Sequence, residues 1–504
     1  MKKYFYLLLL TVLVLSLENC KEARKEKIQK NAISKQQQLA RAREDSLRIT
    51  IARFAGDSCF RNAGIGLLLV ELKPEKSKVI ANINADLSLV PASVLKIMTT
   101  STALEVLGGS KCFSTSLQYN GKIVGRVLKG NLFIRGGGDP TFNAGKAFSR
   151  WASAVKEMGI DTIAGNVIGD ARIFERFYIP LTWTWGELNS AYSAAASGLS
   201  FNGNTYMLTT DARRKKPFTP VKGQIKPFIP GIQFQNLVYE AAIPESNLFA
   251  SGDPYGNHKF ILGGIPKGQP GFAYYGTIPD PPATACFEFI SELQQKGIVV
   301  TGKAVNLLTF ADSAGMETIQ GERTSIGHSF SPSVSSLVTM TNQESNNFFA
   351  EHLIKHLGLN KYHNGSDDGG ARAIADYWKS KGMDTGGLFI FDGCGISRYN
   401  AITARQLVFV LEHMQKSPYF SVFYNSLPLA GVSGTLRKMF KNTSAEGNLR
   451  AKTGTMSRIK SLAGYVETRN HKTLAFAIIL NNFNCSQQDV KSKLEILIQQ
   501  ITND

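Results

Sequence analysis

A long β-rich stretch interrupts this chain between two segments of helical pattern, and the interruption limits the folds open to it. Residues 110–325 hold short alternating strands, many glycines and prolines, and few helical periodicities. The segments on either side each combine a strand hairpin with apolar helices. We therefore expect the outer segments to share one antiparallel sheet flanked by helices. The fold class is then α+β, with the middle stretch as an insertion. Periodicity predicts helices over 283–296, 331–357, 401–414 and 488–501, and strands over 64–72, 78–90, 461–468 and 473–483.

The first twenty residues have the pattern of an export signal. Lys2 and Lys3 precede an apolar run over residues 4–17, which forms a charged n-region and a short h-region. The run is shorter than a membrane-spanning helix requires. Cys20 follows it, where a bacterial lipoprotein carries its lipid, and lipidation, simple cleavage and an uncleaved anchor all stay open. We predict an exported protein of the bacterial periplasm or cell envelope, with membrane contact only through this segment.

Composition divides the rest of the chain. Residues 21–50 are rich in Lys, Arg, Gln and Glu, and predict a basic tether that leads into an N-terminal helix. We expect residues 51–110 and 326–504 to form the two parts of one catalytic-type domain. Residues 111–325 then form one or two inserted β-rich domains, with an inner one at about 200–275.

Charge and cysteine spacing exclude some functions and leave others open. The net charge of +18 favours an anionic cell envelope, and no nucleic-acid motif accompanies it. None of the six cysteines forms a Cys-x-x-Cys pair, so we expect no zinc site and no other metal. Export permits disulfides, but the spacing does not decide their pairing. The oligomeric state also stays open.

The stretch Pro91–Thr100 predicts the start of a buried helix that carries a nucleophile. Pro91 suits the first turn of a helix, and Ser93 and Lys96 are three residues apart, on the same face. A Ser hydroxyl needs a base to become a nucleophile, and a Lys becomes one when burial lowers its pKa. The same spacing occurs twice more in the chain, so a capping Ser beside a surface Lys is the alternative for this motif alone.

Two further polar clusters suit the same chemistry. Ser345 and Asn347 lie between two helical stretches, where a hydroxyl can relay a proton and an amide can bind a peptide group. Lys452, Thr453 and Gly454 precede the last hairpin, where a Lys and a hydroxyl on a strand edge can hold a carboxylate. A loop and an exposed strand start are the alternatives for each cluster taken alone.

The three clusters occur in the order Ser-x-x-Lys, Ser-x-Asn, Lys-Thr-Gly, which is far more specific than any one of them. In this order the chain resembles the D-alanyl-D-alanine carboxypeptidase/endopeptidase family, the DacB-like class C penicillin-binding proteins of peptidase family S13. That family also inserts extra domains between the first two motifs. Four further stretches carry the resemblance: Gly137–Pro140, Trp183–Trp185, Asp392–Arg398 and Leu427–Leu436.

The resemblance implies a penicillin-binding-protein/β-lactamase-like catalytic domain that hydrolyses peptidoglycan stem peptides at D-Ala bonds through an acyl-enzyme, without a cofactor. Its partners are then peptidoglycan peptides and β-lactam antibiotics, and no nucleic acid. The implied catalytic residues are the nucleophile Ser93, the general base Lys96 and the proton relay Ser345. The implied substrate-binding residues are Asn347, Lys452, Thr453, Gly454 and Thr455, with the backbone N–H groups of Ser93 and Thr455 as the oxyanion hole.

Two positions depart from the family pattern. Cys394 stands where Ser is usual, which is harmless if this segment only shapes the cleft and lowers activity if the hydroxyl binds substrate. Asn346 stands where Asp is common. His352 and His356 have the spacing of a metal pair but lack a third ligand, and Cys394 lacks a base that would make it a nucleophile. A β-lactamase or esterase on the same fold and an inactive envelope scaffold are the alternative functions.

Overall fold

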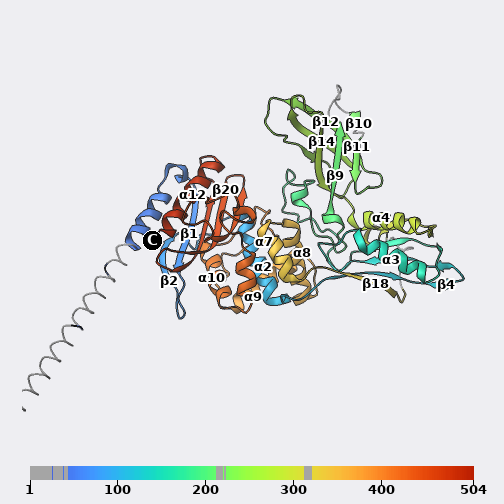
Figure 1. Ribbon diagram of the computed structural model, residues 1–504, viewed down its shortest axis with the longest axis horizontal. Coiled ribbons are helices and arrows are strands. Elements are labelled where there is room, and N and C mark those ends of the chain that lie inside the picture. The colour runs from blue at the N-terminus through green and yellow to red at the C-terminus, as the bar shows by residue number, and fades with distance from the viewer. Residues whose placement is uncertain are drawn as a thin grey trace, which may run out of the picture.

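The computed structural model of the protein describes residues 44–211, 219–220, 223–310 and 321–503, with residues 25 and 38. The predicted export signal with Cys20, and the predicted tether before residue 44 apart from two single residues, lie outside these ranges. Within them, no helix is long and apolar enough to cross a membrane. Figure 1 shows a body of helices and one sheet at one end of the molecule and β-rich parts at the other.

One five-stranded antiparallel sheet joins the two ends of the chain, as predicted. Its strand order is β19-β20-β21-β1-β2, so β19 is an edge strand. The strands are β1 (Gly64–Glu71), β2 (Lys78–Ile83), β19 (Arg450–Met456), β20 (Ile459–Glu467) and β21 (Thr473–Asn481). The central strand β21 is buried at all but its first residue, and apolar from Leu474 to Leu480, because helices cover both faces of the sheet. β2 ends earlier than predicted, because the chain turns at Asn84 with φ of 43°.

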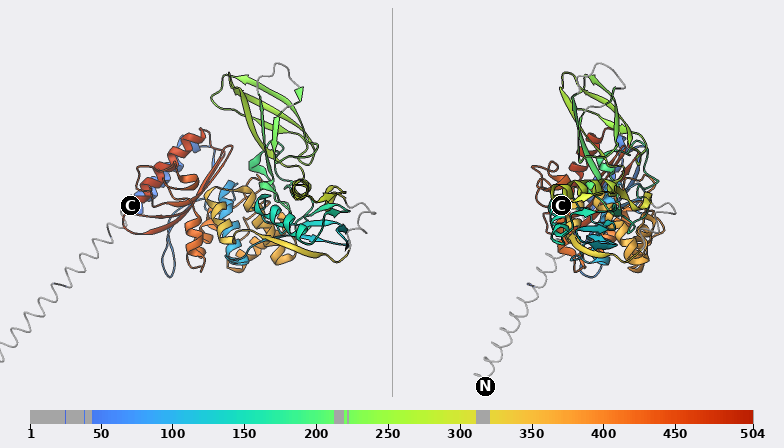
Figure 2. Two further views of the ribbon diagram at one scale, coloured as in Figure 1. Left: turned by 45° about the vertical axis from the view of Figure 1, so that its right-hand side comes forward. Right: turned by 90° about the vertical axis from the view of Figure 1, so that its right-hand side faces the viewer.

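Helices cover the two faces of this sheet (Figure 2). One face packs against a helix over residues 44–55 and the C-terminal helix α12 (Gln487–Thr502). The helices beneath the other face are α2 (Lys96–Leu107), α7 (Val334–Gln343), α8 (Asn347–Tyr362), α9 (Asp367–Ser380), α10 (Ala404–Gln415) and α11 (Phe420–Ser426). The helical pattern predicted over 331–357 is thus two helices, with residues 344–346 as the turn between them.

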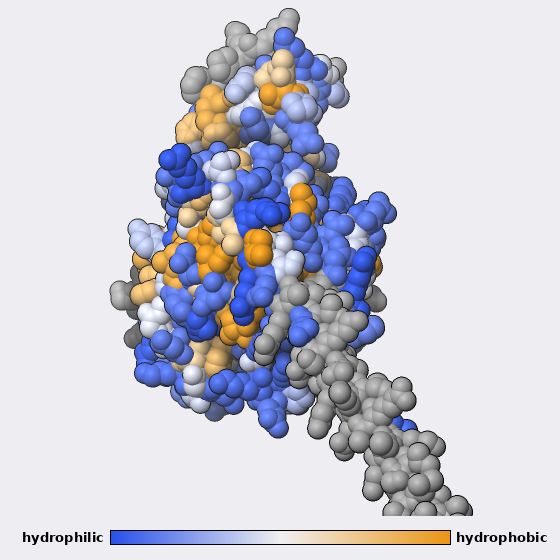
Figure 3. Space-filling model, turned by 90° about the vertical axis from the view of Figure 1, so that its left-hand side faces the viewer, coloured by the Kyte–Doolittle hydropathy of each residue, from blue (hydrophilic) through white to orange (hydrophobic). Residues whose placement is uncertain are grey.

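A disulfide joins the beginning of the described chain to its end. Cys59, in the 3₁₀ turn η1 (Ser58–Phe60), is bonded to Cys485 just before α12. An ion pair between Asp57 and Lys493 lies beside it. Figure 3 shows the surface at this end of the molecule, which is hydrophilic around a group of apolar residues. Three described cysteines are free: Cys112 is exposed, and Cys286 and Cys394 are buried.

The inserted block is built on a second five-stranded sheet, with the order β17-β8-β6-β3-β18. Its strands are β3 (Ser114–Tyr119), β6 (Leu132–Arg135), β8 (Val167–Asp170), β17 (Ala304–Asn306) and β18 (Thr324–Phe330). β18 pairs with β3, so the inserted sheet continues to Phe330, past the boundary drawn at residue 325. The helices α3 (Gly145–Glu157) and α4 (Pro281–Gln295) share an aromatic core with this sheet, and α4 matches the predicted helix over 283–296.

Smaller sheets complete the block. One has the order β16-β7-β5-β4, with strands Val299–Val300, Thr162–Ile163, Val127–Lys129 and Lys122–Val124. Two others share one core and form a lobe that projects from the body (Figure 1). They are β11-β9-β15 (Gly223–Lys226, Thr205–Asp211, Gly271–Thr277) and β10-β12-β14-β13 (Thr219–Pro220, Gln233–Ala241, His258–Pro266, Phe249–Ser251). The remaining short elements are α5 (Leu307–Phe310), η3 (Ala191–Ser193), η4 (Asn202–Asn204) and η5 (Gly434–Leu436).

Candidate active site

Ser93 lies in a 3₁₀ turn, and Lys96 is the first residue of the buried helix that follows it. The turn is η2 (Ala92–Leu95), and Lys96 begins α2. Residues three apart lie directly above one another in a 3₁₀ turn, so the Lys96 Nζ reaches the Ser93 Oγ at 3.0 Å. Ala92 has φ of 49°, an uncommon conformation for a side chain with a Cβ. A Cβ on Gly395 would lie 2.1 Å from the Ala92 carbonyl oxygen, so only glycine fits against this strained turn.

Lys96 is fully buried and is surrounded by neutral acceptors. Its Nζ lies 2.7 Å from the Asn347 Oδ1 and 2.7 Å from the Cys394 carbonyl oxygen. Burial lowers the pKa of Lys96, and the acidic side chains of Cys394 and Asp392 oppose this effect. A Lys with a lowered pKa carries a free amine closer to neutral pH than an exposed Lys does, and the hydroxyl of Ser93 is directly in front of that amine.

Lys452, on the edge strand β19, forms a second Lys–Ser pair with Ser345, near the Ser93–Lys96 pair. The Nζ of the fully buried Lys452 donates to the Ser345 Oγ at 2.8 Å and to the Thr453 carbonyl oxygen at 2.9 Å. Ser345 has φ of 54°, in the turn between α7 and α8. Burial lowers the pKa of Lys452 well below its usual range, and the charge of Lys96 lowers it further. The two lysines therefore influence each other's protonation.

The backbone of β19 approaches Ser93 closely at a glycine. A Cβ on Gly454 would lie 2.7 Å from the Pro91 carbonyl oxygen and 3.0 Å from the Ser93 nitrogen. The Thr453 Oγ1 donates to the Thr435 Oγ1 at 2.8 Å, and Thr455 is exposed further along the strand. The edge of β19 therefore faces Ser93, and the structure brings all eight predicted site residues together around it.

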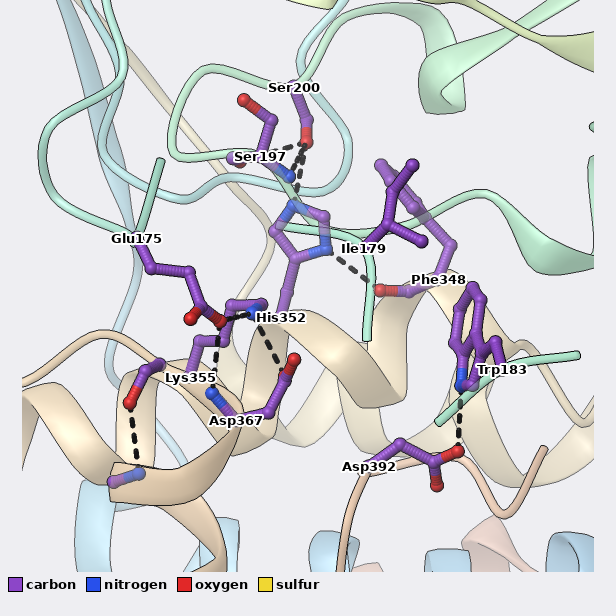
Figure 4. A network of polar contacts seen from close by, with 12 residues as sticks. Glu175, Ile179, Trp183, Ser197, Ser200, Phe348, His352, Lys355, Asp367 and Asp392 are labelled. Atoms are coloured by element: carbon purple, nitrogen blue, oxygen red, sulfur yellow. Dashed lines mark hydrogen bonds and ion pairs between the residues drawn. The ribbon is translucent and has the colours of Figure 1, made fainter. Parts of the chain in front are cut away.

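The inserted block contributes to this site, which the sequence did not predict. The Asn347 Nδ2 donates to the Tyr192 carbonyl oxygen at 2.8 Å. The Trp183 Nε1 donates to the Asp392 Oδ2 at 2.9 Å (Figure 4). Trp183 belongs to one of the stretches that carry the family resemblance, whereas Tyr192 acts through its backbone and leaves no signal in its residue type. Residues of the inserted block thus hold Asn347 and Asp392 in place by hydrogen bonds.

The helix that begins at Asn347 also carries a buried polar network to the inserted block (Figure 4). Lys355 forms ion pairs with Glu175 and with Asp367, the latter at 2.9 Å. The His352 ring lies within hydrogen-bond distance of the Ser200 Oγ and of its own helix backbone, and the His356 Nε2 lies 2.9 Å from the Gly138 carbonyl oxygen. Both histidines are therefore engaged in packing contacts rather than turned toward a common metal position.

One group of three buried side chains among the described residues has the ligand types of a metal site: Glu351, Asp392 and Cys394. Both oxygens of Asp392 already accept two hydrogen bonds each. The arrangement therefore does not make this group a metal site. The Cys394 thiol is fully buried beside Glu351, so it is not placed to act as a nucleophile.

Comparison with protein families decides where this chain belongs. The model of the D-Ala-D-Ala carboxypeptidase 3 (S13) family matches residues 47–503. The chain belongs to this family. It is a hydrolase of the peptidase class, as its relatives also indicate. A D-alanyl-D-alanine carboxypeptidase of Actinomadura sp. (strain R39) is 28% identical over 453 residues, which cover 87% of this chain and 82% of that protein.

Two further comparisons agree with this membership in the S13 family. The D-alanyl-D-alanine carboxypeptidase DacB of Haemophilus influenzae is 26% identical over 430 residues, which cover 84% of this chain and 87% of that protein. The crystal structure of penicillin binding protein 4 (dacB) from the same organism covers 88% of this chain and 96% of its own, with a TM-score of 0.74 and 23% identity. The S13 fold, a penicillin-binding-protein-like domain with additional β-rich parts, is therefore the fold of this chain.

Proposed function

We propose that this protein is an exported serine-type D-Ala-D-Ala carboxypeptidase or endopeptidase that acts on peptidoglycan stem peptides through an acyl-enzyme on Ser93. The observation that carries the proposal is the Ser93–Lys96 pair. A fully buried amine lies 3.0 Å from a partly exposed hydroxyl, and two neutral acceptors hold that amine in place. The S13 membership supplies the substrate class, and the charged n-region and apolar run before Cys20 support export.

In the acylation step, the Ser93 Oγ attacks the carbonyl carbon of the penultimate D-Ala while the Lys96 Nζ takes the hydroxyl proton. The carbonyl oxygen becomes an oxyanion. The backbone N–H groups of Ser93 and Thr455 are the donors we assign to it, which the close approach of β19 at Gly454 supports. The substrate's terminal carboxylate lies at Lys452 and at Thr453, whose hydroxyl donates to the Thr435 Oγ1.

The leaving D-Ala needs a proton on its nitrogen when the peptide bond breaks. Ser345 is placed to supply it, because its Oγ lies 2.8 Å from the Lys452 Nζ. The substrate's carboxylate beside Lys452 favours the ammonium form, from which Ser345 can regain a proton. Asn347 holds the amide on the acyl side of the bond and also fixes Lys96. The proton that Lys96 took from Ser93 then passes to the Ser345–Lys452 pair, where it replaces the proton given to D-Ala and leaves Lys96 a free amine again. In deacylation, Lys96 takes a proton from water as the water oxygen attacks the ester carbon, and it returns that proton to the departing Ser93 Oγ. β-Lactams acylate the same oxygen.

Covalent labelling tests this function directly. The protein without residues 1–20 is incubated with a fluorescent penicillin, beside Ser93→Ala and the matched control Ser153→Ala. Ser153 belongs to another Ser-x-x-Lys pattern, on α3. We expect a persistent labelled band in wild type and in Ser153→Ala, and none in Ser93→Ala. Release of D-Ala from a pentapeptide then measures the peptidase reaction. Folded wild-type protein that is never labelled and releases no D-Ala would refute the proposal.

A further inference from the structure

One buried side chain beside Lys96 takes no part in the steps above. Glu351 lies on α8, one turn after Asn347, and is 0% exposed. Among the described residues, neither of its carboxyl oxygens has an N–H or O–H donor. Its polar neighbours are the Cys394 thiol and the Asp392 carboxylate, whose atoms lie within 4.8 Å of it and of each other. A buried carboxyl group without donors is costly in its ionised form, so its protonation state needs an explanation.

Asp392 cannot donate a hydrogen bond to Glu351, because it is a carboxylate whose oxygens already accept four hydrogen bonds. Its Oδ1 accepts from the Gly395 N–H at 2.7 Å and from the Asn400 Nδ2 at 2.8 Å. Its Oδ2 accepts from the Ser397 N–H and from the Trp183 Nε1 (Figure 4). Four donors are what an ionised carboxylate requires in a buried site. A second negative charge next to it would be repelled.

The cations around Glu351 are engaged elsewhere. Lys355 follows on the same helix, but it is paired with Glu175 and with Asp367 from α9. Lys96 from α2 donates to the Cys394 carbonyl oxygen, on the backbone side of that residue. Burial accordingly raises the pKa of Glu351 well above its usual range, and the charges of Asp392 and Asp367 raise it further.

We propose that Glu351 is held as the neutral carboxylic acid, with the Cys394 thiol as its neighbour, and that its lack of charge allows Lys96 to remain a free amine. This inference rests on the proposed role of Lys96 as the base. An ionised Glu351 would place a second negative charge behind Lys96 and favour its ammonium form, which cannot accept the Ser93 proton. A thiol is a weak donor that stabilises an ionised carboxylate poorly, whereas the serine usual in this family at position 394 is a stronger donor.

Infrared difference spectroscopy at neutral pH tests the protonation state without any use of activity. A protonated carboxyl group has a carbonyl stretch that an ionised one lacks. We expect this band in the difference between wild type and Glu351→Gln, and no such band for the exposed control Glu157→Gln. Cys394→Ala provides a second test that keeps Glu351: removal of the thiol should move the band. If the difference spectra contain no carboxylic-acid band, Glu351 is ionised and the proposal is overturned.

The pH profile of Ser93 acylation tests the effect on Lys96. Glu351→Gln should leave the acidic limb where it is in wild type, because it replaces one neutral group by another. Cys394→Ser should move the limb to higher pH by roughly one unit, since it favours an ionised Glu351, and the double variant should restore it. A shift to lower pH in Glu351→Gln, or an unmoved limb in Cys394→Ser, would contradict the proposal. If Ser93 is never acylated, the proposed function fails, yet the infrared result still decides the state of Glu351.

Discussion

Lys96 and Lys355 are both fully buried, and they differ in their partners. Lys96 contacts a hydroxyl, an amide oxygen and a backbone carbonyl, and burial lowers its pKa. Lys355 contacts the carboxylates of Glu175 and Asp367, and their charges outweigh burial and raise its pKa. Burial is thus common to both, and the charge of the neighbours decides whether a buried Lys can serve as a base or as a structural cation.

Removal of the Lys96 amine should have the largest effect, and it should act on the rate of Ser93 acylation. Lys96→Met should lower the second-order rate of Ser93 acylation by about 10³-fold, because no other described base lies at the Ser93 hydroxyl. The free energy of unfolding should not fall, since the amine has no charged partner. Stopped-flow labelling with a fluorescent penicillin and urea unfolding measure the two quantities. A variant that acylates at the wild-type rate would show that Lys96 is not the base.

Removal of the Lys355 amine should lower the stability of the fold rather than the rate of acylation. Lys355→Met leaves two carboxylates without their cation and should lower the free energy of unfolding by about 3 kcal/mol. We take the low end of the range for a broken buried pair because the Glu175 side chain is 33% exposed. The control Lys361→Met, which breaks a surface pair with Asp376, should cost well under 1 kcal/mol. Equal losses in the two variants would contradict the comparison.

Lys96 can also be given the kind of partner that Lys355 has. Asn347→Asp places a carboxylate at the atom that lies 2.7 Å from the Lys96 Nζ. The charge should raise the pKa of Lys96, so the free amine appears only at higher pH and the acidic limb of acylation moves up by roughly one unit or more. Acylation at neutral pH then falls about tenfold and recovers in alkaline buffer. A rate that stays low at every pH would indicate misplaced groups instead of a changed pKa.

The two buried histidines on α8 predict a pH-dependent effect on stability. Burial lowers the pKa of His352 and of His356 to about 3, so both are neutral in the folded protein. The unfolded chain binds protons near its ordinary pKa of about 6.5, so the free energy of unfolding should fall as pH drops from about 6.5 toward 3. His356→Phe should reduce this slope by one proton in urea titrations over that range. An unchanged slope would exclude His356 as a source.

The outer hairpins, their shared sheet and the three motifs were all predictable from the sequence. Alternation and periodicity report which faces are apolar, and the Ser-x-x-Lys, Ser-x-Asn and Lys-Thr-Gly spacings are local. The 3₁₀ geometry at Ser93 was not predictable, because it depends on Gly395, which is distant in sequence. The roles of Tyr192 and Glu351 were also not predictable from the sequence, for related reasons. One acts through a backbone carbonyl, and the other occupies a helix position whose burial only the packing reveals.

The bond between Cys59 and Cys485 makes the protein a closed covalent ring, because it spans 426 positions of the chain. The catalytic groups and all of the inserted block, with its projecting lobe, lie within this ring. A protease that cuts one exposed turn of the lobe opens the ring but releases no fragment. The two parts of the catalytic domain stay tethered at the sheet they share. After one cut in the lobe, the protein is still one covalent molecule, and it becomes two separate chains only when the disulfide is reduced.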